Sequence, residues 1–285
     1  MDQRRIGDRE VSAIGLGGMP MSVRETNDVD RGVQTVHRAL DEGVTLIDTA
    51  DVYTPNDAPL GHNEDVIAKA LGSYGSSTDH VLVATKGGMT RDGADWGTDG
   101  SPKWLREACE ASLRRLGVHA IGLYQHHRPD SRVPYAESMG ALKQLLDDGL
   151  IVRAGISNAD PEQIRTASEV LGDGLVSVQN QFSPKFRSSE PELELCEERG
   201  IAFLPWSPLG GMGEAGELGT RFDVFARIAE KYGVSPQQIA LAWQLAKSPV
   251  VIPIPGASRP ESIADSAGAA DLTLDPDDFE ALDAA

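Results

Sequence analysis

The sequence predicts a (β/α)8 TIM barrel that forms one domain over residues 1–285, with extended loops after its third and seventh strands. Short apolar runs alternate with amphipathic stretches eight times along the chain, as expected when every strand is followed by a helix. No change in composition and no long linker divides the 285 residues. The run Gly15-Leu-Gly-Gly18 lacks the glycine spacing of a dinucleotide-binding turn, which disfavours the alternative of a doubly wound open sheet.

Each predicted strand is a short apolar run, and each is followed by a predicted amphipathic helix. The strands take residues 11–17, 45–49, 81–86, 121–126, 152–157, 175–180, 202–206 and 250–254. The helices take residues 30–42, 63–71, 102–116, 135–147, 160–171, 190–199, 235–246 and 260–267. Proline in the first helical turn, as at Pro161, Pro236 and Pro260, and glycine after the last turn, as at Gly117 and Gly200, mark the helix ends.

Two segments are longer than the connections of a minimal barrel. Residues 87–100 follow the third strand and contain Trp96, and residues 209–219 follow the seventh strand; both are rich in glycine. Both segments follow strands, so they lie on the face where barrel enzymes keep their active sites. We expect them to act as lids over substrate and cofactor, the alternative being that they are tolerated insertions.

The charge balance limits the classes of partner. The formal net charge is −18, from 44 acidic and 26 basic residues, which opposes binding to nucleic acid and to anionic lipid. No apolar run approaches the roughly 20 residues of a membrane span, and the N-terminus lacks the apolar core of a signal peptide. Cys109 and Cys196 suggest no disulfide framework. These features predict a cytoplasmic protein; they predict no oligomeric state.

Polar and ionisable side chains recur where the predicted strands end. They are Asp48, Lys86, His126, His127, Ser157, Asn158, Gln179, Asn180, Gln181, Trp206 and Ser207. Each alone has a structural explanation, such as a helix cap or a solvated strand end. Because the carboxyl ends of barrel strands meet on one face, the set as a whole indicates an active site.

The residue types at these positions favour reduction of a carbonyl group. Burying Asp48 is unfavourable unless a partner neutralises it, and Lys86 on the next strand is that partner. A lysine beside the phenol of Tyr53 favours the phenolate and prepares Tyr53 to donate a proton near neutral pH. A nearby histidine can orient a carbonyl oxygen. A tyrosine acid in a sequence with no metal-ligand set and no nucleophile elbow suits reduction of a carbonyl, and the hydride for that reduction is expected from a bound cofactor.

Nine motifs, in this order along nearly the whole chain, resemble those of the aldo-keto reductase superfamily. They are Asp48-Thr-Ala-x-x-Tyr53, Gly61-His-Asn-Glu64, Thr85-Lys86, Glu110-x-Ser-Leu-Arg-Arg-Leu-Gly117, Leu123-Tyr-x-x-His-Arg-Pro-Asp130, Gly155-Ile-Ser-Asn158, Val178-Gln-Asn180, Trp206-Ser-Pro-Leu-Gly210 and Ile254-Pro-Gly256. The resemblance implies a barrel that binds extended NADPH without a Rossmann domain. It also implies the reversible reduction of small aldehydes or ketones to alcohols.

The resemblance carries catalytic roles onto matching positions. Tyr53 is the implied general acid, Asp48 and Lys86 tune it, and a histidine orients the substrate. The family motif places that histidine directly before Arg-Pro or Trp-Pro, so it is His127 here. Alternation along the strand points His126 to the other side.

The resemblance also implies cofactor contacts. Ser157, Asn158 and Gln179 match positions that bind the nicotinamide carboxamide, and Trp206 matches the aromatic residue stacked on the ring. The positions that match the pyrophosphate are Ser207, Pro208, Leu209 and Gly210. The positions that match the adenosine are Gly256, Ser258, Arg259 and Asp265. The expected cofactor-binding residues also include Gly18, Met19 and Asp48. The sequence departs from the pattern at Ser262 and Ser266. Arg259 with Ser258 remains as a clamp for a 2′-phosphate, which favours NADP over NAD.

Substrate contacts are expected from Met21, Trp96 and His127, with Met19, Val52 and Met212 as further apolar candidates. These residues admit small aromatic or aliphatic carbonyl compounds and select no single one. Two alternatives stay open. In the first, the chain is a cofactor-binding, redox-sensing or regulatory barrel with little turnover. In the second, Lys86 forms a Schiff base as in aldolase-type barrels.

Overall fold

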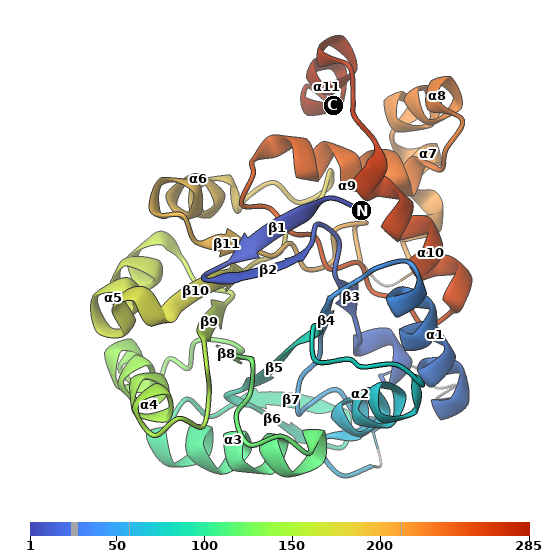
Figure 1. Cartoon of the computed structure of the whole chain (residues 1–285). Helices are drawn as coiled ribbons and strands as arrows, with labels where there is room; N and C mark the ends of the chain where they lie inside the picture. Colours follow the sequence, from blue (N-terminus) through green and yellow to red (C-terminus); the bar gives the residue numbers. More distant parts are fainter. Residues whose placement is uncertain (24–27, 57, 212) are drawn as a thin grey trace.

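The computed structural model describes residues 1–23, 28–56, 58–211 and 213–285. A curved parallel sheet forms the centre of the molecule, and helices surround it (Figure 1). The sheet order is β11-β10-β9-β8-β5-β4-β3. The bounds are β3 Leu16–Gly17, β4 Leu46–Asp48, β5 Leu82–Gly87, β8 Leu123–His126, β9 Ala154–Ser157, β10 Leu175–Gln179 and β11 Ala202–Phe203.

Residues 250–256 take the eighth position and close the barrel. On one side this segment bridges in parallel to Phe203 of β11, and on the other it bridges to Gly17 of β3. The Gly17 nitrogen donates to the Pro255 carbonyl at 2.9 Å, and the Gly15 nitrogen donates to the Pro253 carbonyl at 2.9 Å. The two prolines lack N–H groups, so the segment accepts these bonds without forming a regular ladder. The predicted (β/α)8 barrel is confirmed.

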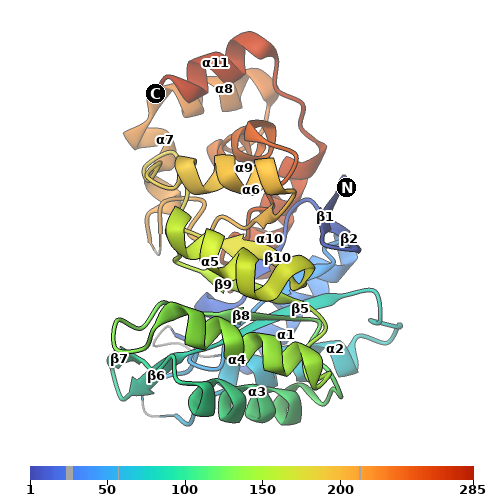
Figure 2. The same ribbon diagram turned by 90° about the vertical axis from the view of Figure 1, so that its left-hand side faces the viewer.

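The eight predicted helices are present, each within two residues of its expected ends. They are α1 Val29–Asp41, α2 His62–Ser73, α3 Pro102–Leu116, α4 Tyr135–Asp147, α5 Pro161–Leu171, α6 Glu190–Arg199, α9 Pro236–Lys247 and α10 Pro260–Gly268. Figure 2 shows α3, α4, α5 and α6 stacked along one side of the barrel. Local signals set these ends, since the Asp160 side chain accepts from the Gln163 nitrogen in a capping box and Gly117 ends α3 in the left-handed region.

The predicted strand over residues 11–17 is in fact two strands with different roles. An N-terminal hairpin of β1 (Gln3–Ile6) and β2 (Arg9–Ser12) crosses the barrel opening, and β3 follows it as the first barrel strand (Figure 1). Ile6 and Val11 are fully buried and pack against Leu46 and Leu82 at the starts of their strands. The hairpin therefore plugs the end of the barrel opposite the expected site.

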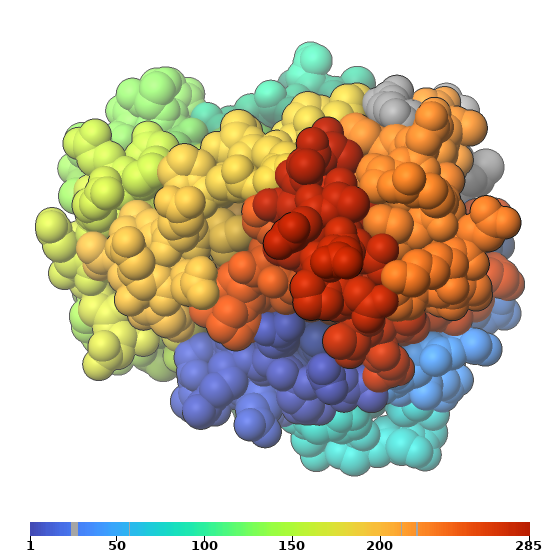
Figure 3. Space-filling view, turned by 90° about the horizontal axis from the view of Figure 1, so that it is seen from above, coloured from blue at the N-terminus to red at the C-terminus, as the bar shows by residue number. Residues whose placement is uncertain are grey.

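Both extended loops contain secondary structure that was not predicted. The loop after the third barrel strand folds into an antiparallel hairpin of β6 (Met89–Asp92) and β7 (Asp95–Thr98). The loop after the seventh leads into α7 (Leu218–Arg221) and α8 (Asp223–Tyr232), and α11 (Pro276–Asp283) packs on α8 and α9 at the outer surface (Figure 3). Short 3-10 turns are η1 Met19–Met21, η2 Gly172–Gly174, η3 Ala215–Glu217 and η4 Ala269–Asp271. None of the helices in the described ranges is both long and apolar enough to span a membrane.

Candidate active site

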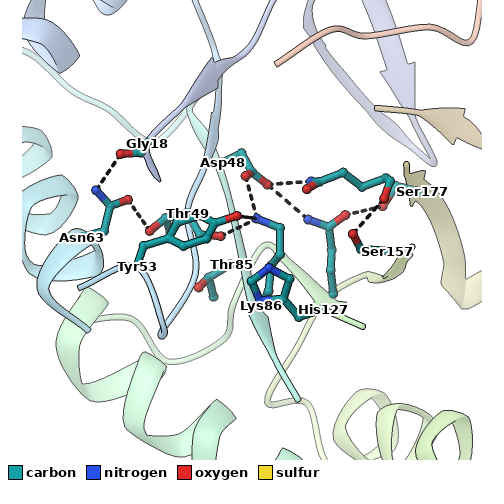
Figure 4. A network of polar contacts seen from close by, with 12 residues as sticks. Gly18, Asp48, Thr49, Tyr53, Asn63, Thr85, Lys86, His127, Ser157 and Ser177 are labelled. Carbon is teal, nitrogen blue, oxygen red and sulfur yellow. Dashed lines mark hydrogen bonds and ion pairs between the residues drawn. The ribbon is translucent and has the colours of Figure 1, made fainter. Parts of the chain in front are cut away.

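A buried lysine organises the carboxyl end of the barrel. Lys86 is the next-to-last residue of β5, its side chain is fully buried, and its ammonium group donates to three oxygens (Figure 4). These are Asp48 Oδ1 at 2.6 Å, the Thr49 carbonyl at 2.8 Å and Tyr53 Oη at 3.3 Å. An ammonium group has three hydrogens, so all of its donors are used. The structure thus brings together Asp48, Lys86 and Tyr53.

The second oxygen of Asp48 is satisfied by two amides. Oδ2 accepts from Gln179 Nε2 at 2.7 Å and from Gln125 Nε2 at 3.3 Å. Sequence reasoning missed Gln125, which lies opposite Lys86 in the β5–β8 register. A glutamine within a predicted barrel strand was the signal that could have found it, because an amide buried there needs a polar partner.

The Asp48–Lys86 pair keeps the lysine charged. Burial alone would lower the pKa of Lys86, but Asp48 and Tyr53 together raise it above its usual value. A Schiff-base lysine needs a lowered pKa to act as a nucleophile, so this environment disfavours the aldolase-type alternative.

The pKa of Tyr53 is raised, contrary to expectation. Burial is the largest cause and outweighs the opposing effect of the Lys86 charge. The expected direction of the lysine's influence was right, but the net direction was wrong. Because Tyr53 Oη accepts from Lys86, the phenolic hydrogen is free for an acceptor in the adjoining cavity.

The two adjacent histidines face different environments. His127 lines the cavity, and its ring meets the Tyr53 ring edge-on at 5.6 Å between centroids. Burial, and then the charges of Lys86 and Arg128, hold the pKa of His127 well below its usual value, so the ring is neutral. His126 points to Tyr135 on α4 and does not line the cavity. The geometry therefore supports His127 over His126.

One cavity of about 630 Å³ joins the catalytic cluster to the expected cofactor positions. It is lined by Met19, Asp48, Tyr53, Trp96, His127, Ser157, Asn158, Gln179, Trp206, Ser207, Pro208, Leu209 and Gly256 among the predicted residues. Both extended loops contribute to the wall, the first through Met89, Trp96 and Thr98 and the second through Leu209 and Gly211.

Several predicted residues lie elsewhere. Gly18, Gly210, Ser258 and Arg259 are outside the cavity wall, and Val52 is fully buried in a cluster beside it. Met212 falls outside the described residues. Two further predicted positions make other contacts in this structure. Met21 belongs to a buried core cluster with Leu16 and Val36, and Asp265 accepts from Ser235 Oγ and Gln238 Nε2 on the α9 N-terminus.

The amide-binding positions are already organised. Asn158 adopts a left-handed φ of 57°, and its Nδ2 donates to the His127 carbonyl and to Ser157 Oγ at 3.0 Å each. Because Gln179 uses its Nε2 on Asp48, its Oε1 faces no donor among the described residues and can accept from a ligand amide. Ser207 also has a positive φ, of 49°. Left-handed conformations of residues other than glycine are uncommon and cluster at functional sites.

Residues of the Gly61–Glu64 and Glu110–Gly117 motifs support the turn that carries Tyr53 from behind. Asn63 accepts from Thr49 Oγ1 at 2.7 Å and donates to the Gly18 carbonyl at 2.9 Å. Glu64 accepts from Thr85 Oγ1 and from Arg115 Nε at 2.6 Å each. These contacts tie α2 and α3 to the loop that carries Tyr53.

Comparison with known proteins identifies the family. The model of the aldo/keto reductase family matches residues 13–285. The chain belongs to the aldo/keto reductase family. It is 35% identical over 284 residues to an uncharacterized oxidoreductase of Schizosaccharomyces pombe, covering 98% of this chain and 88% of the relative.

Solved aldo/keto reductase structures have the same architecture. A glycerol dehydrogenase from Gluconobacter oxydans is 30% identical with a TM-score of 0.85, covering 99% of this chain and 94% of that one. An aldo-keto reductase from Klebsiella pneumoniae, crystallised with NADPH, is 26% identical with a TM-score of 0.83, covering 100% and 95%.

This aldo/keto reductase also contains a buried acid that the catalytic cluster does not use. Asp51 is 1% exposed, and neither of its carboxyl oxygens has a hydrogen-bond partner within the described ranges. Burial and then the nearby Glu64 raise the pKa of Asp51 to about 8, against the opposing charges of Arg115 and Lys86. Asp51 is therefore mostly protonated at pH 7.

We expect Asp51 to make the free energy of unfolding depend on pH. Its folded pKa of about 8 exceeds the unfolded value of about 3.9, so between these values only the folded state holds the proton. The contribution of Asp51 to the free energy of unfolding is fully present below pH 4. It falls as the pH rises towards 8, by up to about 1.4 kcal/mol per pH unit. Urea unfolding at pH 5, 6, 7 and 8 should give a flatter profile for Asp51→Asn than for the wild type. Exposed Asp173 provides the control Asp173→Asn, and parallel profiles for all three proteins would contradict the prediction.

Proposed function

We propose that this aldo/keto reductase reduces small aldehydes or ketones to alcohols with NADPH, using Tyr53 as the general acid. The observation that carries the proposal is the Tyr53 hydroxyl. Its oxygen is held by Lys86, while its hydrogen is free at the wall of the cavity beside His127. Crystallisation of a similar aldo-keto reductase with NADPH supports the choice of cofactor.

The residues of the cluster divide the reaction between them. Bound NADPH supplies a hydride to the carbonyl carbon. Neutral His127 donates a hydrogen bond that orients the carbonyl oxygen towards Tyr53, and Tyr53 transfers its proton to that oxygen. The Lys86 ammonium group stabilises the resulting phenolate. Before the phenolate forms, Asp48 balances the lysine charge.

The cavity suits the cofactor in shape and donor type. Trp206 offers a flat face to the nicotinamide, while Ser157, Asn158 and Gln179 offer amide and hydroxyl groups to its carboxamide. The wall continues to Gly256, where we place the pyrophosphate, and on the way it is lined by Ser207, Pro208, Leu209, Gly211, Gly213 and Ala215. Glycines along this wall let a ligand approach the backbone closely. Trp96 and His127 remain as the substrate-binding residues.

The 2′-phosphate is assigned to Arg259 with Ser258, at the start of α10. Arg259 is exposed and forms no ion pair among the residues the structure describes. We expect Arg259→Ala to weaken NADPH binding about 10-fold or more while changing NADH binding little, since a guanidinium–phosphate contact exists only with NADPH. Fluorescence titration measures both dissociation constants, with Arg165→Ala on exposed α5 as the control. An equal effect on NADPH and NADH would remove Arg259 from the phosphate site.

The function itself is tested by NADPH oxidation against a panel of aromatic and aliphatic carbonyl compounds. Turnover with any of them supports the proposal. A barrel that only binds the cofactor would show NADPH binding and, at most, a single oxidation event in rapid mixing. That result would favour the regulatory alternative.

A further inference from the structure

Arg91 lies on β6, outside the catalytic cluster, and contacts the turn that carries Tyr53. Its Nη1 donates to the Thr54 carbonyl at 3.1 Å and to the Val52 carbonyl at 3.4 Å. These two carbonyls immediately precede and follow Tyr53 in the chain. Nη2 donates to Asn56 Oδ1 at 2.6 Å, further along the same turn. One guanidinium group thus fixes the backbone on both sides of the proposed general acid.

The same guanidinium group stacks on a residue of the cavity wall. Arg91 and Trp96 are paired across the β6–β7 hairpin, and the Arg91 Cζ lies 4.1 Å from the centre of the Trp96 ring. Trp96 is 39% exposed and lines the cavity together with Thr98. A guanidinium group is attracted to the face of an indole ring, so the two side chains hold one another in place.

We propose that Arg91 is a positioning residue that links the substrate wall at Trp96 to the placement of Tyr53. The inference rests on the proposed function, because it concerns the same proton transfer. Substrate packed against Trp96 stabilises the stack, the stack fixes Arg91, and Arg91 fixes the backbone around Tyr53. The hairpin is therefore part of the device that holds the general acid and is more than a cover for the cavity.

The position of the Tyr53 hydroxyl depends on the turn that Arg91 contacts. The hydroxyl is held by one polar contact, from Lys86 at 3.3 Å, so its position depends on the backbone of the turn. A displacement of about 1 Å at a reacting group can lower the rate by roughly 100-fold. Only arginine offers several donors in one rigid plane; lysine offers a single charged nitrogen at this distance from the backbone.

The test compares Arg91→Met with a matched control at an arginine that contacts the same hairpin from outside it. Arg132 donates to the carbonyl of Thr98 at the far end of β7 and has no contact with the Tyr53 turn in the described residues. We expect Arg91→Met to lower kcat by about 30-fold, with the NADPH Kd within about twofold of the wild type. Arg132→Met should raise KM and leave kcat within about threefold. Arg91→Lys should recover part of the kcat loss.

A double-mutant cycle tests the link to Trp96. If Trp96 acts on Tyr53 through Arg91, then Trp96→Leu combined with Arg91→Met should lower kcat no further than Arg91→Met alone. If the fall in kcat of the double variant equals the product of the two single falls, Trp96 and Arg91 act independently, and the link is overturned.

The remaining outcomes are also decisive. If the wild type turns over and Arg91→Met has the same kcat, this inference alone is overturned. An equal fall in kcat for Arg91→Met and Arg132→Met also overturns it alone. Absence of wild-type turnover with every carbonyl overturns the proposed function and this inference together. If Arg91→Met does not fold, Arg91→Lys carries the test. A fall in its kcat of about fivefold or more then supports the inference, and an unchanged kcat overturns it.

Discussion

Tyr53→Phe is expected to lower kcat for carbonyl reduction by about 1,000-fold or more while leaving NADPH binding nearly intact. We assign the proton transfer to the phenol, whereas His127 only orients the carbonyl oxygen, and phenylalanine keeps the ring that meets His127. Loss of the hydroxyl also frees one Lys86 donor, but Asp48 and the Thr49 carbonyl still hold the ammonium group.

Steady-state kinetics and fluorescence titration of NADPH check this expectation. Tyr74→Phe is the matched control, because the Tyr74 hydroxyl donates to Asp41 outside the cavity. Its activity should equal that of the wild type. If Tyr53→Phe keeps as much as about a tenth of the wild-type kcat, Tyr53 is not the general acid.

Lys86→Met is expected to impair both stability and activity. Methionine fills a similar volume but leaves the Asp48 carboxylate buried and without its counter-charge, which costs about 3–5 kcal/mol of unfolding free energy. Activity should fall because the Tyr53 phenolate formed during reduction loses the adjacent cation.

The double variant Asp48→Asn/Lys86→Met separates the two effects. Removing the buried charge should recover part of the unfolding free energy measured in urea, while kcat stays as low as in Lys86→Met. Recovery of kcat together with stability would show that Lys86 acts only through the fold. The thermal midpoint of each variant should follow the urea result.

Local sequence patterns predicted most of the barrel. Periodicity, proline at helix starts and glycine at helix ends are properties of neighbouring residues, so the eight helices were found within two residues of their ends. The N-terminal hairpin was missed because its short strands gain stability mainly from packing on the barrel. The β6–β7 hairpin was missed because its strands have only four residues each and lie in a glycine-rich segment. The strand at 250–254 was predicted, but its prolines leave it without a regular ladder.

The grouping of the residues that we propose to be catalytic was predictable from their positions at strand ends. Asp48 and Lys86 stand at the ends of adjacent barrel strands, and the Arg-Pro after His127 distinguishes it from His126. Met21 was expected among the substrate contacts, because an apolar residue after the first strand can pack inward or line the cavity. Only the packing of η1 shows that it joins the core.

By itself, then, the sequence determined the barrel, the family resemblance and the identity of the Asp48–Tyr53–Lys86 cluster. Only the tertiary structure showed that the Gln125 amide donates to Asp48 and that Arg91 donates to the backbone beside Tyr53. It also decided the direction of the Tyr53 pKa shift. The physical reason is the range of the forces involved. Helix and strand signals act between near neighbours, whereas desolvation and hydrogen-bond geometry depend on the distances between segments that only the folded chain brings together.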